Sequence, residues 1–137
     1  MTEFPISGGC LCGAVRFRVT AEPVAAYYCH CRMCQRTSGA PLTASATVPI
    51  EGFAFTKGEP AVYQSSANLV RLFCGTCGCQ LAARHPVDPK LMDFNLGCLD
   101  DPEAIKPNYH VFTSSRIGWF EVADDLPRHA EQEPESL

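Results

Sequence analysis

The most informative stretch of the chain is Cys29-His30-Cys31-Arg32-Met33-Cys34, which places three thiols within six residues. Three thiolates can bind one zinc ion, and catalytic zinc commonly keeps three protein ligands with the fourth position left to water or substrate. We call Cys29, Cys31 and Cys34 the thiol triplet, and its spacing predicts an open metal site. A fourth protein ligand would close that site, and the candidates are Cys79, Cys98, His30 and His110.

Two further pairs of cysteines, Cys10/Cys12 and Cys74/Cys77, lie outside the triplet. The Cys-x-x-Cys spacing followed by Gly78 is typical of a zinc knuckle, because two such thiolates chelate one tetrahedral ion and glycine permits a positive φ. On an extended segment, the Cys10 and Cys12 side chains would point to the same face. The two pairs together predict a closed, structural four-thiolate zinc site. The alternative is two unrelated pairs of buried thiols.

The composition of the 137-residue chain indicates a globular β protein that binds metal. Hydrophobic residues make up 46% and charged residues 19%, and eleven prolines and ten glycines favour short strands joined by turns. The formal net charge of -4 offers no basic surface for nucleic acid or an anionic membrane. No signal peptide or membrane span is visible, so we expect a cytoplasmic protein whose nine cysteines bind metal instead of forming disulfides.

Hydrophobic alternation and turn residues predict about ten short strands. The clearest segments are 14–20, 24–28, 42–48, 52–56, 61–65, 68–73, 80–84, 91–96 and 109–113. A helical turn is expected only over residues 31–38, stopped by Gly39 and Pro41. The fold class is therefore mainly β with little helix, as a folded-over antiparallel sheet or a sandwich. We expect one domain over residues 1–126 and a polar tail over 127–137, with fraying from Asp124 onward.

Four segments, residues 9–13, 29–40, 73–78 and 97–102, resemble in this order the glutathione-dependent formaldehyde-activating enzyme family. That family also includes the zinc-binding domain of centromere protein V. The resemblance implies a β-tent fold with two zinc ions per chain. It assigns the structural ion to Cys10, Cys12, Cys74 and Cys77, and the catalytic ion to Cys29, Cys31 and Cys34. The chain departs from the family pattern at Cys79, Cys98 and Gln35.

The resemblance implies a carbon–sulfur lyase-type enzyme similar to S-(hydroxymethyl)glutathione synthase, which activates a small thiol such as glutathione for reversible addition to an aldehyde. Arg36 is a candidate to bind a glutathione carboxylate, although a solvated surface arginine is an equal alternative. His110 is either a satisfied strand histidine or a group that orients the substrate. The rival functions are a non-catalytic zinc module for protein interaction, which would need four ligands at both ions, and an iron–sulfur protein.

Overall fold

The computed structural model describes residues 3–132 and confirms a mainly β fold with little helix. Its strands are β1 (Ile6–Gly9), β2 (Arg16–Val19), β3 (Ala25–Cys29), β4 (Thr43–Pro49), β5 (Phe53–Lys57), β6 (Ala61–Ser66), β7 (Leu69–Phe73), β8 (Gln80–Arg84), β9 (Leu91–Asn95) and β10 (Tyr109–Val111). The helices are α1 (Arg32–Ser38) and the short 3₁₀ turns η1 (Ile50–Gly52), η2 (Leu96–Cys98) and η3 (Thr113–Ser115). No helix in the described range has the length and apolar composition needed to cross a membrane.

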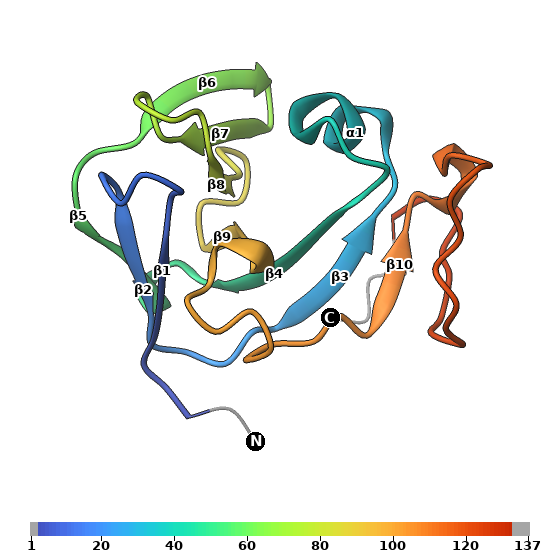
Figure 1. Cartoon of the computed structure of the whole chain (residues 1–137), viewed down its shortest axis with the longest axis horizontal. Coiled ribbons are helices and arrows are strands. Elements are labelled where there is room, and N and C mark those ends of the chain that lie inside the picture. The colour runs from blue at the N-terminus through green and yellow to red at the C-terminus, as the bar shows by residue number, and fades with distance from the viewer. Residues whose placement is uncertain (1–2, 133–137) are drawn as a thin grey trace.

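The strands form two sheets, a small one in the order β1-β2-β5 and a large one in the order β10-β3-β4-β9-β8-β7-β6 (Figure 1). Neighbouring strands are antiparallel, except that β10 runs parallel to β3. The expected antiparallel β fold is confirmed, and the pair at this edge is a parallel addition that the sequence did not predict. A parallel pair requires a long crossover, and the chain supplies one because it passes through β4 to β9 before β10 returns to the free side of β3.

The hydrophobic core lies between the small sheet and one face of the large sheet. Strand alternation gives that face a row of apolar residues in register across five strands: Ala26, Ala46, Phe94, Ala82 and Leu72. The Phe17 ring of the small sheet packs against Phe94 with a centroid distance of 5.8 Å, and it stacks on Phe53 at 5.1 Å. Burying these aromatic rings holds the two sheets together.

The opposite face of the large sheet carries polar side chains, because alternate residues of each strand point to opposite faces. Ser45 lies in register with Tyr27 and Asn95, and its hydroxyl lies 3.0 Å from Asn95 Oδ1. Thr47 donates to Asp93 Oδ1 over 2.6 Å. Polar groups that pair in this way can line a partly buried surface without a large desolvation cost.

The N-terminal segment is more ordered than the sequence predicted. No strand was predicted before residue 14, but Ile6–Gly9 form β1 and pair with β2. A Cβ atom at Gly8 would lie 2.4 Å from the Cys98 carbonyl oxygen, so the two backbones approach as closely as only glycine allows. The segment lacks clear alternation, which is why the strand was missed.

The C-terminal stretch also differs from the expectation of fraying from Asp124. The His110 amide donates to the Pro127 carbonyl over 2.8 Å, and the His129 amide donates to the His110 carbonyl over 2.9 Å. The orange-to-red segment beside β10 in Figure 1 follows this course. An edge strand leaves backbone groups unpaired, and residues 127–131 satisfy those of β10 and the turn after it. Residues 133–137 of the expected tail lie outside the described range.

Candidate metal centres and the cavity beside them

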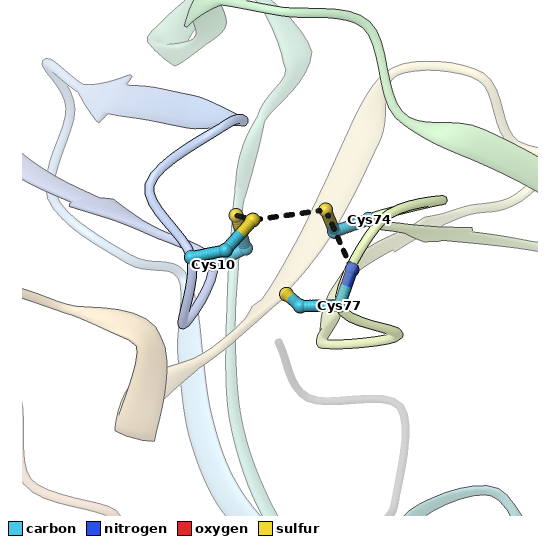
Figure 2. A group of neighbouring side chains, drawn as sticks. Cys10, Cys74 and Cys77 are labelled. Carbon is cyan, nitrogen blue, oxygen red and sulfur yellow. Dashed lines mark hydrogen bonds between the residues drawn. The ribbon is translucent and has the colours of Figure 1, made fainter.

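The sulfur atoms of Cys10, Cys12, Cys74 and Cys77 converge, and all four lie within 4.8 Å of one another. Figure 2 shows the labelled side chains turned toward a common centre. The Cys10–Cys12 sulfur distance is 3.7 Å and the Cys12–Cys74 distance is 3.8 Å. A tetrahedral zinc ion with Zn–S bonds of about 2.3 Å has sulfur–sulfur edges of about 3.8 Å. The four sulfurs therefore have the spacing that tetrahedral zinc requires.

Two glycine-assisted turns bring these four cysteines together. Residues 10–13 form a turn, with the Gly13 amide 3.2 Å from the Cys10 carbonyl and a φ of +81° at Gly13. The predicted extended conformation of Cys10 and Cys12 is therefore wrong, because Gly13 permits a turn that brings both sulfurs to one side. The predicted positive φ at Gly78 is confirmed, at +80°.

Backbone amides point at the sulfur atoms of this four-sulfur set. The Val15 amide lies 3.3 Å from Cys10 Sγ, and the amides of Thr76 and Cys77 lie 3.4 Å from Cys74 Sγ. The hydrogen bond from Val15 lowers the pKa of the Cys10 thiol to about 6. Amide donors stabilise thiolates, so the turns are suited to hold negative sulfur ligands around a cation.

The thiol triplet is built at the junction of β3 and α1. Cys29 ends β3, Cys31 is the N-cap of α1, and the Cys34 amide in the first helical turn donates to Cys31 Sγ over 3.3 Å. The three sulfurs lie within 4.8 Å of one another, and within residues 3–132 no other Cys, His, Asp or Glu ligand atom joins the group. The predicted helical turn over residues 31–38 is confirmed, and Gly39 ends it with a φ of +69°.

The close contacts among the triplet sulfurs shift the pKa values of their thiols. Hydrogen bonds from the thiols of Cys29 and Cys34 lower the pKa of Cys31, and the Cys31 sulfur in turn raises the pKa of Cys29. Three thiolates this close repel one another unless a positive charge lies between them. The donor set therefore fits a soft divalent cation such as zinc, which would displace the remaining protons.

A cavity of about 310 Å³ opens beside the triplet and runs along the polar face of the large sheet. Cys29, Cys31 and Cys34 lie in its wall together with Met33 and Thr37 of α1. A volume of this size accommodates a small organic molecule. The triplet is therefore placed where a substrate could reach it.

The far wall of the cavity carries two basic side chains, His85 and Arg71. His85 Nε2 lies 2.6 Å from Asp93 Oδ2, and this contact raises the pKa of His85. The Arg71 Nε group donates to Ser65 Oγ over 3.1 Å, and no ion pair with a carboxylate is formed by Arg71 within the described residues. Arg71 is therefore the guanidinium in the cavity wall whose charge is available to a ligand.

Arg36, the arginine predicted from the sequence to bind a carboxylate, does not line the cavity, whereas Arg71 does. Arg36 lies in the last turn of α1 and lines a separate surface hollow with Pro41 and Trp119, outside the cavity wall. Alternation along residues 69–73 did indicate that Arg71 faces away from Val70 and Leu72. It could not indicate which face of the sheet borders the triplet.

Cys79 and Cys98, which were considered as closing ligands, contact each other and not the triplet. Their sulfurs are 3.6 Å apart, and the Cys98 thiol donates to the Gln80 carbonyl over 3.2 Å. Both side chains pack against the main core cluster, which also contains Cys10, Cys74 and Cys77. The triplet belongs to a different cluster, with Ala25, Tyr109 and Val111.

The two histidines considered as fourth ligands also lie elsewhere. His30 Nε2 is 2.8 Å from His110 Nδ1, on the side of β3 and β10 opposite to the cavity. His30 points away from the thiols, as expected for a residue between two ligands. His110 is 1% exposed and hydrogen-bonded, which agrees with the alternative of a satisfied strand histidine.

A family model and a curated relative agree on one family, and a solved structure shares the fold. The model of the family described as glutathione-dependent formaldehyde-activating enzyme matches residues 5–115. A curated protein of Halomonas elongata that is named after the same enzyme is 28% identical over 130 residues, covering 85% of this chain and 80% of that protein. A crystal structure of a Rhodobacter sphaeroides protein superposes with a TM-score of 0.60 at 25% identity, covering 74% of this chain and 92% of that one.

Proposed function

Because the chain belongs to the glutathione-dependent formaldehyde-activating enzyme family, we propose that it is a zinc-dependent enzyme of the carbon–sulfur lyase class. Its reaction is the reversible addition of a small thiol such as glutathione to an aldehyde such as formaldehyde, as in S-(hydroxymethyl)glutathione synthase. The observation that carries the proposal is a group of three sulfurs, Cys29, Cys31 and Cys34, that borders a cavity and lacks a fourth protein ligand within the described residues.

The triplet would hold one zinc ion through three thiolate ligands, beside the cavity whose wall these cysteines share. A zinc ion bound there would lower the pKa of a thiol that enters the fourth position, so that the thiol is present as a nucleophilic thiolate at neutral pH. Cys10, Cys12, Cys74 and Cys77 would hold a second zinc ion through four thiolates, and such an ion would have a structural role. Two zinc ions per chain follow from this division.

Arg71 binds an anionic group of the thiol substrate in this proposal. Glutathione carries two carboxylates, and a guanidinium binds a carboxylate through two parallel hydrogen bonds. The single contact of its Nε group with Ser65 leaves the terminal nitrogens of Arg71 for that purpose. Arg36 remains a second candidate for anion binding, at the surface hollow on the outer side of α1.

Ser45 and Asn95, which border the cavity between the triplet and Asp93, provide neutral polar contacts along the bound thiol. Water-excluding contacts come from Tyr27 and Tyr109, whose rings pack at a centroid distance of 5.7 Å. We place this reaction in the cytoplasm, where thiols stay reduced. The net charge of -4 gives no reason to propose a nucleic-acid partner.

The test is exchange NMR on glutathione, formaldehyde and their adduct at equilibrium, with and without zinc-loaded protein. The proposal predicts that catalytic amounts of the wild-type protein accelerate the interconversion, and that Cys29→Ala removes the acceleration together with one of two zinc ions. A wild-type protein that holds two zinc ions and leaves the exchange rate unchanged would contradict the proposal, and it would favour the non-catalytic zinc module.

A further inference from the structure

A chain of buried hydrogen bonds lies directly behind the thiol triplet, on the face of β3 and β10 opposite to the cavity. It runs from His30 Nε2 to His110 Nδ1 over 2.8 Å, and from His110 Nε2 to the Asp124 carboxylate over 3.1 Å. His30 and His110 are 5% and 1% exposed, and Tyr28 stacks on the His110 ring at a centroid distance of 4.8 Å. None of these three side chains has a role in the proposed reaction.

The donors and acceptors of this chain follow from its carboxylate end. The Asp124 carboxylate can only accept, so His110 Nε2 carries a proton. The contact with His30 uses the other ring nitrogen, His110 Nδ1, so the His110 ring joins His30 to the carboxylate. Asp124 is itself held by Arg128, at 2.8 Å, and by the Leu126 amide, at 3.1 Å. The Leu126 amide keeps this carboxylate in place when Arg128 is replaced, so the chain has a fixed end that does not depend on Arg128.

The backbone of His30 is held as firmly as its ring. Its amide donates to the Val111 carbonyl over 3.1 Å, and its carbonyl accepts from Gln35 Nε2 over 2.8 Å. The same Gln35 nitrogen lies 3.1 Å from the Ser115 carbonyl. Gln35 is 4% exposed, so its side chain forms a buried link between the His30 and Ser115 carbonyls.

These contacts fix the one residue that separates two of the three sulfurs. His30 connects Cys29 at the end of β3 to Cys31 at the start of α1, so its backbone direction sets how the two sulfurs approach each other. We infer that His110 and Asp124 are positioning residues for the thiol triplet, and that they act through His30 to hold the three sulfurs together before an ion binds. The inference rests on the proposed metal site and concerns its assembly, not the substrate.

A ligand set that is organised before binding has a higher affinity for its metal, because less ordering is needed on binding. Outer groups that orient metal ligands typically contribute about 10- to 100-fold to metal affinity. We therefore expect Asp124→Ala and His110→Phe to weaken zinc binding at the triplet by about 10- to 100-fold. Affinity at Cys10, Cys12, Cys74 and Cys77 should stay unchanged, and this set serves as a control within the same molecule.

The experiment measures both zinc affinities by competition with a chromophoric chelator, on wild type, Asp124→Ala, His110→Phe and a control, Arg128→Gln. The control removes the Arg128 contacts with Asp124 and with the Val122 and Leu126 carbonyls, but it leaves the His110–Asp124 contact in place. Cobalt substitution adds a spectroscopic readout, because the d–d bands report the geometry of the three-sulfur site. The Asp124 side chain is 21% exposed, so Asp124→Ala tests the inference even if His110→Phe does not fold.

The inference predicts selective weakening of one of two ions, with altered cobalt bands, in Asp124→Ala and not in Arg128→Gln. It is overturned if Asp124→Ala binds both ions as wild type does, or if Arg128→Gln shows an equal loss, which would indicate packing of the C-terminal segment instead. Equal weakening at both sites would also overturn it. A wild-type protein that binds a single ion would contradict the proposed function as well, so the two failures are distinguishable.

Discussion

The two sulfur clusters differ in how far apart their members lie along the chain, and this difference supports the separate roles that we propose for them. Cys12 and Cys74 are 62 positions apart, whereas the triplet lies within six residues. Closing a loop of about 60 residues costs only a few kcal/mol in chain entropy, while a structural zinc ion contributes on the order of 10 kcal/mol. An ion at the four-sulfur set can therefore connect the turn after β1 to the turn after β7. An ion at the triplet would not connect segments that are distant along the chain, because all three ligands lie within residues 29–34.

The surroundings of the two clusters follow the same division. The four-sulfur set packs against the main core, whereas the triplet borders a cavity with polar walls. A local set of ligands contributes little to holding the fold together, so one coordination position can be left to a substrate without loss of stability. The comparison leads to four predictions that differ in the size of the expected effect.

The largest effect is expected from breaking the four-sulfur set. Cys74→Ser should remove the structural ion and lower the free energy of unfolding by about 5 kcal/mol or more, comparable to the whole stability of a small domain. Circular dichroism and zinc content measure the outcome. Cys98→Ser is the matched control, because its sulfur lies next to this set without belonging to it. A folded Cys74→Ser protein with two ions would contradict the division.

Breaking the triplet should abolish activity and leave the fold intact. Cys31→Ser removes one of three ligands but keeps a good N-cap for α1, since serine is among the favoured N-cap residues. We expect the loss of one ion and a fall in turnover of more than about 100-fold, beyond the effect typical of an outer-shell change. Unfolding in parallel with Cys74→Ser would show that both clusters are structural.

Arg71→Gln should weaken binding of the thiol without disabling the triplet. Hydrogen bonds to charged groups contribute about 1.5–3 kcal/mol, so KM for glutathione should rise about 10-fold or more while kcat changes little. N-acetylcysteamine, a thiol without carboxylates, should show no such difference between wild type and variant. Arg36→Gln is the control. A rise in KM for glutathione in Arg36→Gln and not in Arg71→Gln would indicate that the carboxylate binds on the outer side of α1 instead.

The smallest effect concerns the His85–Asp93 pair at the far wall of the cavity. Its hydrogen bond with Asp93 raises the pKa of His85, and the Asp88 charge acts in the same direction. A raised folded-state pKa adds stability that is complete below about pH 6.5, the unfolded pKa, and that is lost as pH rises through the folded-state pKa. His85→Gln should therefore be less stable than wild type by about 1 kcal/mol at pH 5.5, and by less at pH 8.5. An equal difference at both values in urea unfolding would contradict the ion pair.

The sequence predicted the parts of this account that depend on local pattern. Alternation of apolar and polar residues located nearly all strands, and for β8 the predicted and observed bounds are identical. Thiol spacing predicted both sulfur clusters. Both succeeded because ligand spacing and strand period are properties of short segments. The turn at Cys10–Gly13 was missed although Gly13 permits it locally. The strand β1 was missed because its segment lacks alternation and is held by its pairing with β2 and its close approach to Cys98.

Long-range register accounts for what else could not be predicted. The parallel pairing of β10 with β3 places His110 beside Tyr28 and brings it to His30, which is 80 positions away. The antiparallel pairing of β7, β8 and β9 places Arg71 and Asp93 on one face. Neither pairing can be predicted from the local sequence, so the residues that surround the triplet are identified only from the fold.

The measurement that tests the central division most directly is ¹¹³Cd NMR of the cadmium-substituted protein, titrated with glutathione. Cadmium replaces zinc at thiolate sites, and its chemical shift depends on the number of sulfur ligands. The account predicts two resonances, of which only one moves when glutathione enters the fourth position, and that same resonance is absent in Cys31→Ser. Two resonances whose chemical shifts both stay unchanged on addition of glutathione would contradict this division of roles. A single resonance in the wild-type protein would contradict it as well.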